Sequence, residues 1–231
     1  MITSISHQFD ADIQQIIDNK TKEVIKYESL VRLINEDGEI ISPYFFLDVS
    51  KKGTYYTKIT NRVIESSFKV LDHIKHNVSI NLSVLDIEND AISTKLLELV
   101  SNPSYKGRVT FELLEDENMK DFQSVKKFIT EAKKVGDVKI AIDDFGSGYS
   151  NFERLLEYNP DILKIDGSLI KNIETDSYSR NIVETIVTFA QKQNIETIAE
   201  FVENESIYNI LNDMGITYSQ GYYFGKPEKL M

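Results

Sequence analysis

Short apolar segments alternate with longer amphipathic segments along most of this chain. The apolar segments have the length of strands, and the amphipathic ones repeat apolar residues every three or four positions, as helices packed on a sheet do. The expected strands are 12–18, 22–33, 78–83, 108–115, 139–145, 161–166, 195–201 and 218–224, and the expected helices are 57–76, 91–101, 122–135, 179–193 and 205–214. Because parallel strands need crossover connections, this order predicts an α/β fold, a TIM-like (β/α)8 barrel.

The first two expected strands do not fit a purely parallel barrel. Only the segment DNKT, residues 18–21, separates them. A connection this short makes a hairpin, and the two strands of a hairpin are antiparallel. We therefore expect a barrel with one antiparallel strand, and a doubly wound open sheet is the alternative.

Composition limits the number of domains and the class of partner. The chain has 231 residues, 41% of them hydrophobic, with no linker, repeat or low-complexity segment, so we expect a single domain over residues 1–231. The formal net charge is −11, which argues against a long nucleic acid as partner because phosphate backbones require a basic surface. A small anionic ligand stays compatible with this charge if a metal or a local Arg or Lys reverses the field.

The chain contains no cysteine, which excludes disulfides and thiolate metal sites and suits a reducing cytoplasm. No apolar run approaches the roughly 18 residues of a membrane helix, and the acidic first twenty residues do not resemble a signal peptide. We expect a cytoplasmic protein, or the cytoplasmic domain of a membrane protein, with no membrane segment in this chain.

Polar side chains lie on or at the ends of seven expected strands. They are Glu28, Arg32, Asn81, Glu112, Asp143, Asp144, Lys164, Asp166, Glu200 and Gln220. In a barrel all parallel strands finish on one face, and that face holds the active site. The sequence therefore predicts that these groups converge on one cavity.

The acids in this set need positive charge. Asp143 and Asp144 are adjacent at the end of an apolar strand, where carboxylates repel and are costly to desolvate. One Lys and one Arg cannot balance this many carboxylates, whereas divalent cations can, and oxygen ligands select hard ions such as Mg²⁺, Mn²⁺ or Ca²⁺. Two ions about 3.5–4 Å apart are the arrangement used in two-metal phosphoester hydrolysis. The segment FGSGYS that follows, 145–150, is either a plain turn or a loop that responds to metal and substrate.

Seven motifs in order carry a resemblance to a known family: YESLVRL, INLS, FELLE, IDDFGSGYSN, LKID, AEFVE and QGYYFGKP. Over nearly the whole chain, the sequence resembles the EAL-domain cyclic-di-GMP phosphodiesterases. The resemblance implies an EAL barrel with its antiparallel strand. It also implies hydrolysis of the bacterial second messenger cyclic di-GMP to linear pGpG by a water that two metal ions activate, with Mg²⁺ or Mn²⁺ as cofactor and Ca²⁺ as inhibitor.

The resemblance also implies a role for each residue that matches a motif. The first metal ion would be held by Glu28, Asn81, Glu112 and Asp143, and the second by Asp143, Asp144 and Glu200. The residues expected to act in catalysis are Glu28, Lys164, Glu200 and Gln220. Lys164 would position the attacking water or assist its deprotonation, and a Lys amid carboxylates stays protonated, which favours positioning.

The remaining matched residues would contact the substrate or a loop. Arg32 would clamp a phosphate with its planar donor fork. Gln220 would place the water or the substrate, Gln14 and Asp166 would contact guanine or ribose, and Glu115 would anchor the 145–151 loop.

Two departures from the family pattern lie beside matched residues. Ser29 stands where the family has Ala, a small change that we expect to be tolerated. Phe201, in AEFVE, stands where the family usually has Gly, and it either crowds the rim of the cavity, stacks on a guanine or packs in the core.

Three functions are compatible with these residues. The first is an active phosphodiesterase, and the complete ligand set favours it. The second is a catalytically silent cyclic-di-GMP receptor or signalling module. The third, an unrelated metal-dependent barrel, explains the acids but not Asn81, Lys164 and Gln220 in this order. The resemblance further implies a homodimer and a longer signalling protein in which a sensor or diguanylate-cyclase domain adjoins this one.

Overall fold

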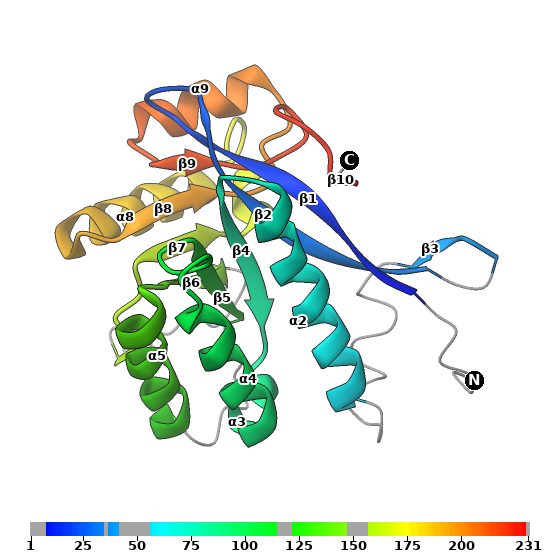
Figure 1. Ribbon diagram of the computed structural model, residues 1–231. Helices are drawn as coiled ribbons and strands as arrows, with labels where there is room; N and C mark the ends of the chain where they lie inside the picture. The colour runs from blue at the N-terminus through cyan, green and yellow to red at the C-terminus, as the bar shows by residue number, and fades with distance from the viewer. Residues whose placement is uncertain (1–7, 35–36, 42–55, 115–121, 147–156, 230–231) are drawn as a thin grey trace.

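A computed structural model of the chain describes residues 8–34, 37–41, 56–114, 122–146 and 157–229 (Figure 1). The strands are β1 (Gln8–Asp18), β2 (Val24–Ile34), β3 (Ile40–Ile41), β4 (Asn77–Leu82), β5 (Val109–Leu114), β6 (Lys139–Phe145), β7 (Ile162–Ile165), β8 (Glu196–Ala199), β9 (Tyr218–Ser219) and β10 (Glu228–Lys229). The helices are α2 (Tyr56–His73), α3 (Val84–Glu88), α4 (Asp90–Ser101), α5 (Phe122–Gly136), α7 (Gly167–Ile170), α8 (Ser177–Gln193) and α9 (Glu205–Asp213).

Eight strands close into a ring, in the order β1-β9-β8-β7-β6-β5-β4-β2, with β2 pairing back to β1. The pairs from β2 through β9 are parallel, and β1 is antiparallel to both of its neighbours. This arrangement confirms the barrel with one reversed strand and excludes the open sheet. β1 and β2 also continue as a two-stranded ribbon toward β3, while helices such as α2, α5 and α8 lie outside the strands (Figure 1).

The reversal of β1 comes from the tight connection predicted at residues 18–21. Asp18 ends β1, and its side chain accepts hydrogen bonds from the backbone amides of Lys20 and Thr21, at 2.8 and 2.9 Å. The amide of Lys22 then returns to the carbonyl oxygen of Asp18 at 2.8 Å, with Lys22 in the left-handed region at φ +61°. This Asx-type turn sends the chain straight back along β1.

An apolar layer closes the barrel interior directly below the polar residues. Ile16, Ala141, Ile162 and Ile198 are buried together as one cluster. Successive side chains of a strand point to opposite faces, so residues two apart share a face. Ile162 and Ile198 therefore lie one layer below Lys164 and Glu200, and this layer separates the polar groups from the opposite end of the barrel.

The helices bury their apolar faces against the outside of the barrel. Ile64 and Phe68 of α2, Leu96 of α4, Phe128 of α5 and Val187 of α8 belong to the main core cluster. Their three- and four-residue spacing is the periodicity that predicted the helices. None of the helices in the described part of the chain has the length and hydropathy that a membrane crossing needs.

The last predicted strand is the element whose structure differs most from its prediction. It was expected over 218–224, but β9 ends at Ser219. Gly221 then adopts φ +159°, and the amide of Phe224 bonds to the Gly221 carbonyl at 3.1 Å, so the segment turns. A side chain on Gly221 would collide with the Val202 backbone at 2.2 Å. This close approach of two backbones, which sequence periodicity does not reveal, ends the strand.

Candidate active site

Lys164 lies at the centre of a cluster of carboxylates inside the barrel. Its side chain is 1% exposed. The Nζ atom is 2.6 Å from Glu112 Oε2, 2.9 Å from Asp143 Oδ1 and 2.9 Å from Glu200 Oε1. The pair with Glu112 has hydrogen-bond geometry, whereas Asp143 Oδ1 meets the ammonium as an ion pair without an aligned hydrogen bond. Four strands thus bring their polar groups to one point, as the sequence predicted.

The charge of Lys164 is stabilised by these neighbours. Burial alone would lower the pKa of Lys164, but the carboxylates of Asp143, Glu112 and Glu200 outweigh burial and raise this pKa well above its ordinary value. The side chain is therefore a permanent cation at neutral pH, and it is a hydrogen-bond donor rather than a base.

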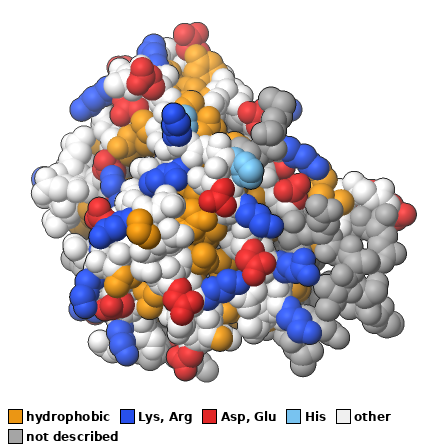
Figure 2. Space-filling view, viewed as in Figure 1, with side chains coloured by type: hydrophobic (Ala, Val, Ile, Leu, Met, Phe, Trp, Pro, Cys, Tyr) orange, Lys and Arg blue, Asp and Glu red, His pale blue; other side chains and the backbone are white. Residues whose placement is uncertain are grey.

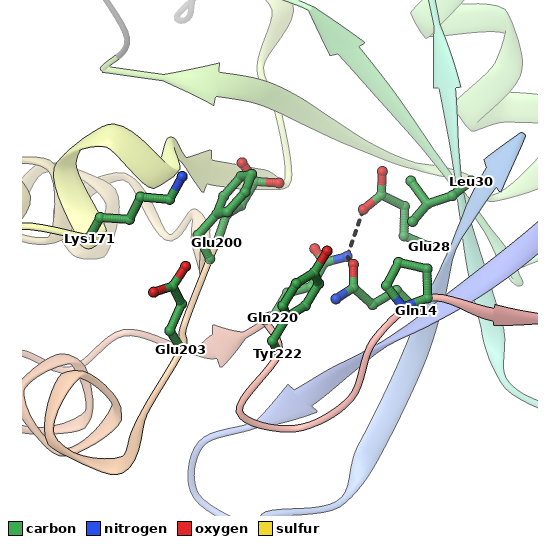
Figure 3. Close-up of a pocket in the computed structure, with 11 residues that line it drawn as sticks. Gln14, Glu28, Leu30, Lys171, Glu200, Glu203, Gln220 and Tyr222 are labelled. Carbon is green, nitrogen blue, oxygen red and sulfur yellow. Dashed lines mark hydrogen bonds between the residues drawn. The ribbon is translucent and has the colours of Figure 1, made fainter. Parts of the chain in front are cut away.

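Two amide side chains orient Glu28. Asn81 Nδ2 donates to Glu28 Oε1 at 2.7 Å, and Gln220 Nε2 donates to Glu28 Oε2 at 2.7 Å (Figure 3). Lys164 Nζ approaches Glu28 Oε2 at 3.5 Å. Burial opposes ionisation of Glu28, but Lys164 and the two amide donors together lower its pKa. Gln14 lies opposite Glu28 in the β1–β2 ladder and accepts a hydrogen bond from Gln220 at 3.3 Å.

In two other carboxyl groups the effect of burial on the pKa outweighs these attractions. Burial raises the pKa of Glu112 to about 7, against the attraction of Lys164 and with repulsion from Glu28 and Asp143. Burial likewise raises the pKa of Glu200 to about 8, again opposed by Lys164. These acids hold their protons more firmly than exposed acids do, because one ammonium does not compensate all of their neighbours.

Asp143 and Asp144 end β6 at an irregularity. The pairing register with β7 shifts between Ile142 and Phe145, and Asp144 adopts φ +54°. This local twist lets two consecutive acids both approach the site, although residues one apart in a regular strand point to opposite faces. Burial, with repulsion from Asp143 and Asp166, raises the pKa of Asp144 to about 6.

The donor atoms fit divalent cations. Asp143, Asp144 and Glu200 each offer a carboxylate oxygen, and these oxygens lie within 4.8 Å of one another. Glu112 Oε1 and Gln220 Oε1 are buried oxygens that accept no hydrogen bond from the described residues. An all-oxygen set with excess negative charge is the donor chemistry that Mg²⁺ and Mn²⁺ prefer.

A cavity of about 310 Å³ opens beside this cluster (Figure 3). The residues that line it are Gln14, Glu28, Leu30, Lys171, Glu200, Phe201, Glu203, Gln220, Gly221, Tyr222 and Pro227. Its volume lies at the lower end of the roughly 300–1,000 Å³ typical of ligand clefts. Glu28, Glu200 and Gln220 belong to both the cluster and the cavity wall, so a bound molecule would reach the proposed metal ligands.

Two predicted site residues make other contacts, and a third lies outside the described residues. Arg32 Nε donates to Asp12 Oδ2 at 2.9 Å, so the guanidinium pairs with β1 rather than with the carboxylate cluster. Asp166 caps α7 by accepting a bond from the Ser168 amide at 3.0 Å. Glu115 lies outside the described residues, as does most of the 145–151 loop. These positions leave the expected substrate and loop contacts as proposals.

The two family departures have clear positions. Ser29 donates to Ser67 of α2 at 3.0 Å, which places its hydroxyl outside the barrel interior, and its tolerance beside Glu28 stays a prediction. Phe201 is 49% exposed and lines the cavity. The core-packing interpretation of Phe201 is therefore wrong.

Sequence reasoning missed several residues of the site. Asp12, the partner of Arg32, and the cavity residues Lys171 and Glu203 had no strand-end signal. Lys26 lies two residues before Glu28 and is buried inside the barrel, where burial lowers its pKa to about 8. Because residues two apart in a strand share a face, the position of Lys26 two residues before Glu28 could have predicted that Lys26 also points into the barrel.

Comparison with known proteins identifies the family. A family model described as the EAL domain matches residues 3–227 of the chain. The chain belongs to the EAL family. Among curated EAL relatives, cyclic di-GMP phosphodiesterase PdeF of Escherichia coli is 32% identical, over 90% of this chain and 28% of the relative. Cyclic di-GMP phosphodiesterase PdeB of Shewanella oneidensis is 31% identical, over 89% of this chain and 24% of the relative.

Solved EAL structures share the fold. An EAL domain protein from Listeria monocytogenes superposes with a TM-score of 0.87 at 28% identity, covering 96% of this chain and 89% of that one. The PaMucR phosphodiesterase in complex with c-di-GMP gives a TM-score of 0.85 at 26% identity, covering 96% and 92%. The chain spans less than a third of the length of the curated relatives named above.

Proposed function

We propose that this EAL domain is a metal-dependent phosphodiesterase that hydrolyses cyclic di-GMP to linear pGpG. The observation that supports this proposal most is the complete oxygen donor set around Lys164, two of whose carboxylates, Glu28 and Glu200, line a cavity of ligand size. Relatives that are about 30% identical over most of this chain carry the phosphodiesterase name. Membership of the EAL family leaves no reason to retain an unrelated metal-dependent barrel as a candidate.

Two ions would share Asp143. Glu28, Asn81, Glu112 and Asp143 would hold the first, and Asp143, Asp144 and Glu200 the second. When bound, Mg²⁺ or Mn²⁺ would lower the pKa of water and offset the negative charge of the phosphodiester. The fit of the second site is supported by the mutual approach of three carboxylate oxygens.

Lys164 would position the attacking water by donating a hydrogen bond. In the metal-free site the surrounding carboxylates raise the pKa of Lys164 well above its ordinary value, and a protonated Lys has no lone pair with which to accept a proton. The same ammonium keeps Glu112, Asp143 and Glu200 close together. An ammonium that holds three carboxylates and donates to water fits a positioning role better than that of a general base.

The substrate would lie in the cavity beside the cluster. Gln14 and Gln220 line it and are hydrogen-bonded to each other, so both can orient a bound nucleotide. Arg32 would clamp a phosphate while Asp12 holds its Nε edge. Asp166 would contact guanine or ribose, and Glu115 would anchor the 145–151 loop.

Partners and location extend the proposal. We infer a homodimer that works in the cytoplasm, joined to a sensor or diguanylate-cyclase domain in a longer protein. The small share of each curated relative that this chain covers supports further domains, and the absence of cysteine suits a reducing compartment.

The deciding experiment incubates purified protein with cyclic di-GMP and Mg²⁺ or Mn²⁺ and follows pGpG by chromatography. We expect turnover with either ion, inhibition by Ca²⁺, and no activity after Glu28→Ala or Asp143→Ala. The alternative function is a silent cyclic-di-GMP receptor. Tight binding of cyclic di-GMP without product, with metal present, would establish that alternative.

A further inference from the structure

A second cavity lies at the end of the barrel opposite the candidate active site. Its volume is about 160 Å³, and the residues that line it are Ile25, Lys26, Asn77, Thr110, Lys139, Ile162, Glu196 and Tyr218. Asn77, Lys139 and Glu196 are the first residues of β4, β6 and β8, so the cavity opens where the parallel strands begin. Ile162 belongs to the apolar layer below Lys164. This layer therefore separates the second cavity from the carboxylate cluster.

Lys26 brings an ammonium group into this cavity. The residue is 3% exposed, and its buried Nζ atom forms no hydrogen bond with any described residue. Glu112 attracts Lys26 from the layer above, but its ion pair is with Lys164, and no carboxylate in the described part of the chain forms an ion pair with Lys26. A buried cation is costly unless it is paired or hydrogen-bonded. The Nζ atom therefore points to a ligand of negative charge.

The one acidic residue among those that line this cavity is already engaged at both of its oxygens. Lys139 donates to Glu196 Oε2 at 2.7 Å, and the Tyr218 hydroxyl donates to Glu196 Oε1 at 2.8 Å. The charge of Lys139 thus offsets that of Glu196. The charged residues that line the cavity leave an excess of one positive charge, which belongs to Lys26.

Neutral hydrogen-bonding groups accompany the ammonium. Thr110 and Asn77 line the cavity with a hydroxyl and an amide. Ser79 lies beside Thr110 in the β4–β5 ladder, on the same face of β4 as Asn77. Its Oγ atom is buried and, among the described residues, has no hydrogen-bond partner. An ammonium surrounded by hydroxyl and amide donors is the chemistry that binds small oxyanions.

The size of the cavity limits the ligand. One water molecule needs roughly 10–15 Å³ of such space, and clefts for larger ligands have roughly 300–1,000 Å³. A volume of about 160 Å³ therefore suits a small ion. An adjoining cavity of about 320 Å³ shares Asn77, Thr110 and Lys139 with it and extends to the exposed residue Asp137, so an ion can enter from solvent.

We propose that Lys26, Thr110 and Asn77 bind a small oxyanion of the phosphate type at this end of the barrel. Lys26 supplies the charge and the buried donors, and Thr110 and Asn77 supply neutral hydrogen bonds. The pair of Lys139 and Glu196 borders the entrance. The inference does not depend on the proposed phosphodiesterase function, because the two cavities share no lining residue.

Calorimetric titration of the metal-free protein with inorganic phosphate at pH 7 tests this site. The absence of metal prevents phosphate from binding to ions in the active site. We expect saturable binding, and we expect Lys26→Met to weaken it at least about tenfold, because a hydrogen bond to a charged group is lost. Lys133→Met is the matched control and should bind as the wild type does. Lys133 lines only the adjoining cavity and is paired with Asp161 at 2.8 Å.

Absence of saturable binding to the wild-type protein overturns the proposal. Equal affinity of the wild type and Lys26→Met does the same, because the ion then lies elsewhere. A loss of binding in Lys133→Met, with Lys26→Met unaffected, assigns the ion to the adjoining cavity and also overturns the site at Lys26.

Thr110→Val keeps the charge of Lys26 and changes the shape of the cavity little. It should weaken phosphate binding about two- to tenfold through the loss of one hydrogen bond, and it decides the question if Lys26→Met does not fold. Crystals soaked in selenate give a direct measurement. We expect an anomalous peak within hydrogen-bond distance of Lys26 Nζ, and peaks at other places alone would overturn the assignment.

Glycerol 3-phosphate distinguishes the free ion from a phosphate ester, since both carry the same oxyanion. Equal or weaker binding than that of inorganic phosphate assigns the site to the free ion. Binding at least tenfold tighter, and reduced by Lys133→Met, assigns it to an ester that extends into the adjoining cavity. Failure of both probes to bind the wild-type protein overturns the proposal.

Discussion

The Nζ atom of Lys164 lies 2.6 Å from Glu112 Oε2, and both side chains are almost fully excluded from solvent. The pair is part of a larger set, because the same ammonium also contacts Asp143 and Glu200. A single buried cation therefore stabilises several acids at once, and the stability of the site depends on it more than on any one carboxylate.

Lys164→Met should destabilise the metal-free protein by about 3–5 kcal/mol, because it leaves buried carboxylates without a cation. Urea denaturation measures the change. Lys139→Met is the control: Lys139 forms a half-exposed pair with Glu196 and should cost less than about 1 kcal/mol. Added Mg²⁺ or Mn²⁺ should stabilise both variants by binding the folded state, but it should stabilise Lys164→Met more, because there the cation also replaces the lost ammonium charge. Equal losses in the two variants would contradict the central role of Lys164.

The metal-free protein should become less stable as the pH rises from about 5.5 to about 7.5. Burial raises the pKa of Glu112 from 4.5 to about 7 and that of Glu200 from 4.5 to about 8, so within this window the folded state binds more protons than the unfolded state. Unfolding free energy then falls with rising pH. Asp144, whose pKa burial raises to about 6, contributes in the same direction, whereas Lys26, whose pKa burial lowers to about 8, opposes the trend toward the upper end of the window. Glu28, with its lowered pKa, and Lys164, with its raised pKa, keep the same charge across this window.

Thermal melting at a series of pH values measures this slope. Glu200→Gln should reduce the slope, and saturating Mg²⁺ should reduce it as well, because a bound cation replaces the protons. A melting temperature that rises across the window in the wild-type protein would contradict the assignment of these two acids.

Gln220→Ala should reduce kcat/KM about 10–100-fold, the range typical for partners that orient a metal ligand. The substitution removes the hydrogen bond to Glu28 Oε2 and the contact with Gln14. It should also weaken Mg²⁺ binding, measured by titration calorimetry. Gln15→Ala is the comparison, since Gln15 of β1 bonds to the carbonyl of Phe224, in the same segment after β9 that contains Gln220. A similar loss of activity in both variants would point to general damage of the packing between β1 and this segment instead.

Gly167→Ala should destabilise the protein by about 1–3 kcal/mol, because the new methyl group would overlap the Phe201 ring. The double variant Gly167→Ala with Phe201→Gly should recover most of that loss, since the ring is gone. Denaturation of the four proteins forms a double-mutant cycle. Strictly additive effects would show that the two residues do not share this space.

The barrel and most of its site could be predicted because both depend on strand period and strand ends. Glu112, Asp143 and Lys164 each lie two residues beyond an inward-facing apolar or small residue, so alternation alone turns them toward the same interior. The short hairpin at 18–21 could also be predicted from neighbouring residues alone, and it makes β1 antiparallel to β2.

Other features depend on contacts between distant parts of the chain. Arg32 pairs with Asp12 because the β1–β2 register brings the two strands together, and no local pattern encodes that pairing. β9 stops where Gly221 meets Val202. Phe201, at φ +52°, lies between the Glu200 amide, which bonds to Ile165 of β7, and the Val202 amide, which bonds to Gln220 just after β9. The balance of charge around Lys171 and Glu203 is likewise a property of the assembled cavity. On the visible face of the molecule, acidic and basic side chains are interspersed (Figure 2).

The reversed strand β1 has an evolutionary consequence. Every other strand of the ring leaves the barrel at the functional end, where its following loop can lengthen or shorten without disturbing the sheet. β1 enters there and connects onward at the far end, so the loop that follows β1 lies away from the site. Insertions on that flank therefore come from neighbouring strands, such as the segment after β9, whose Gly225 carbonyl accepts a hydrogen bond from Gln14 at 3.0 Å.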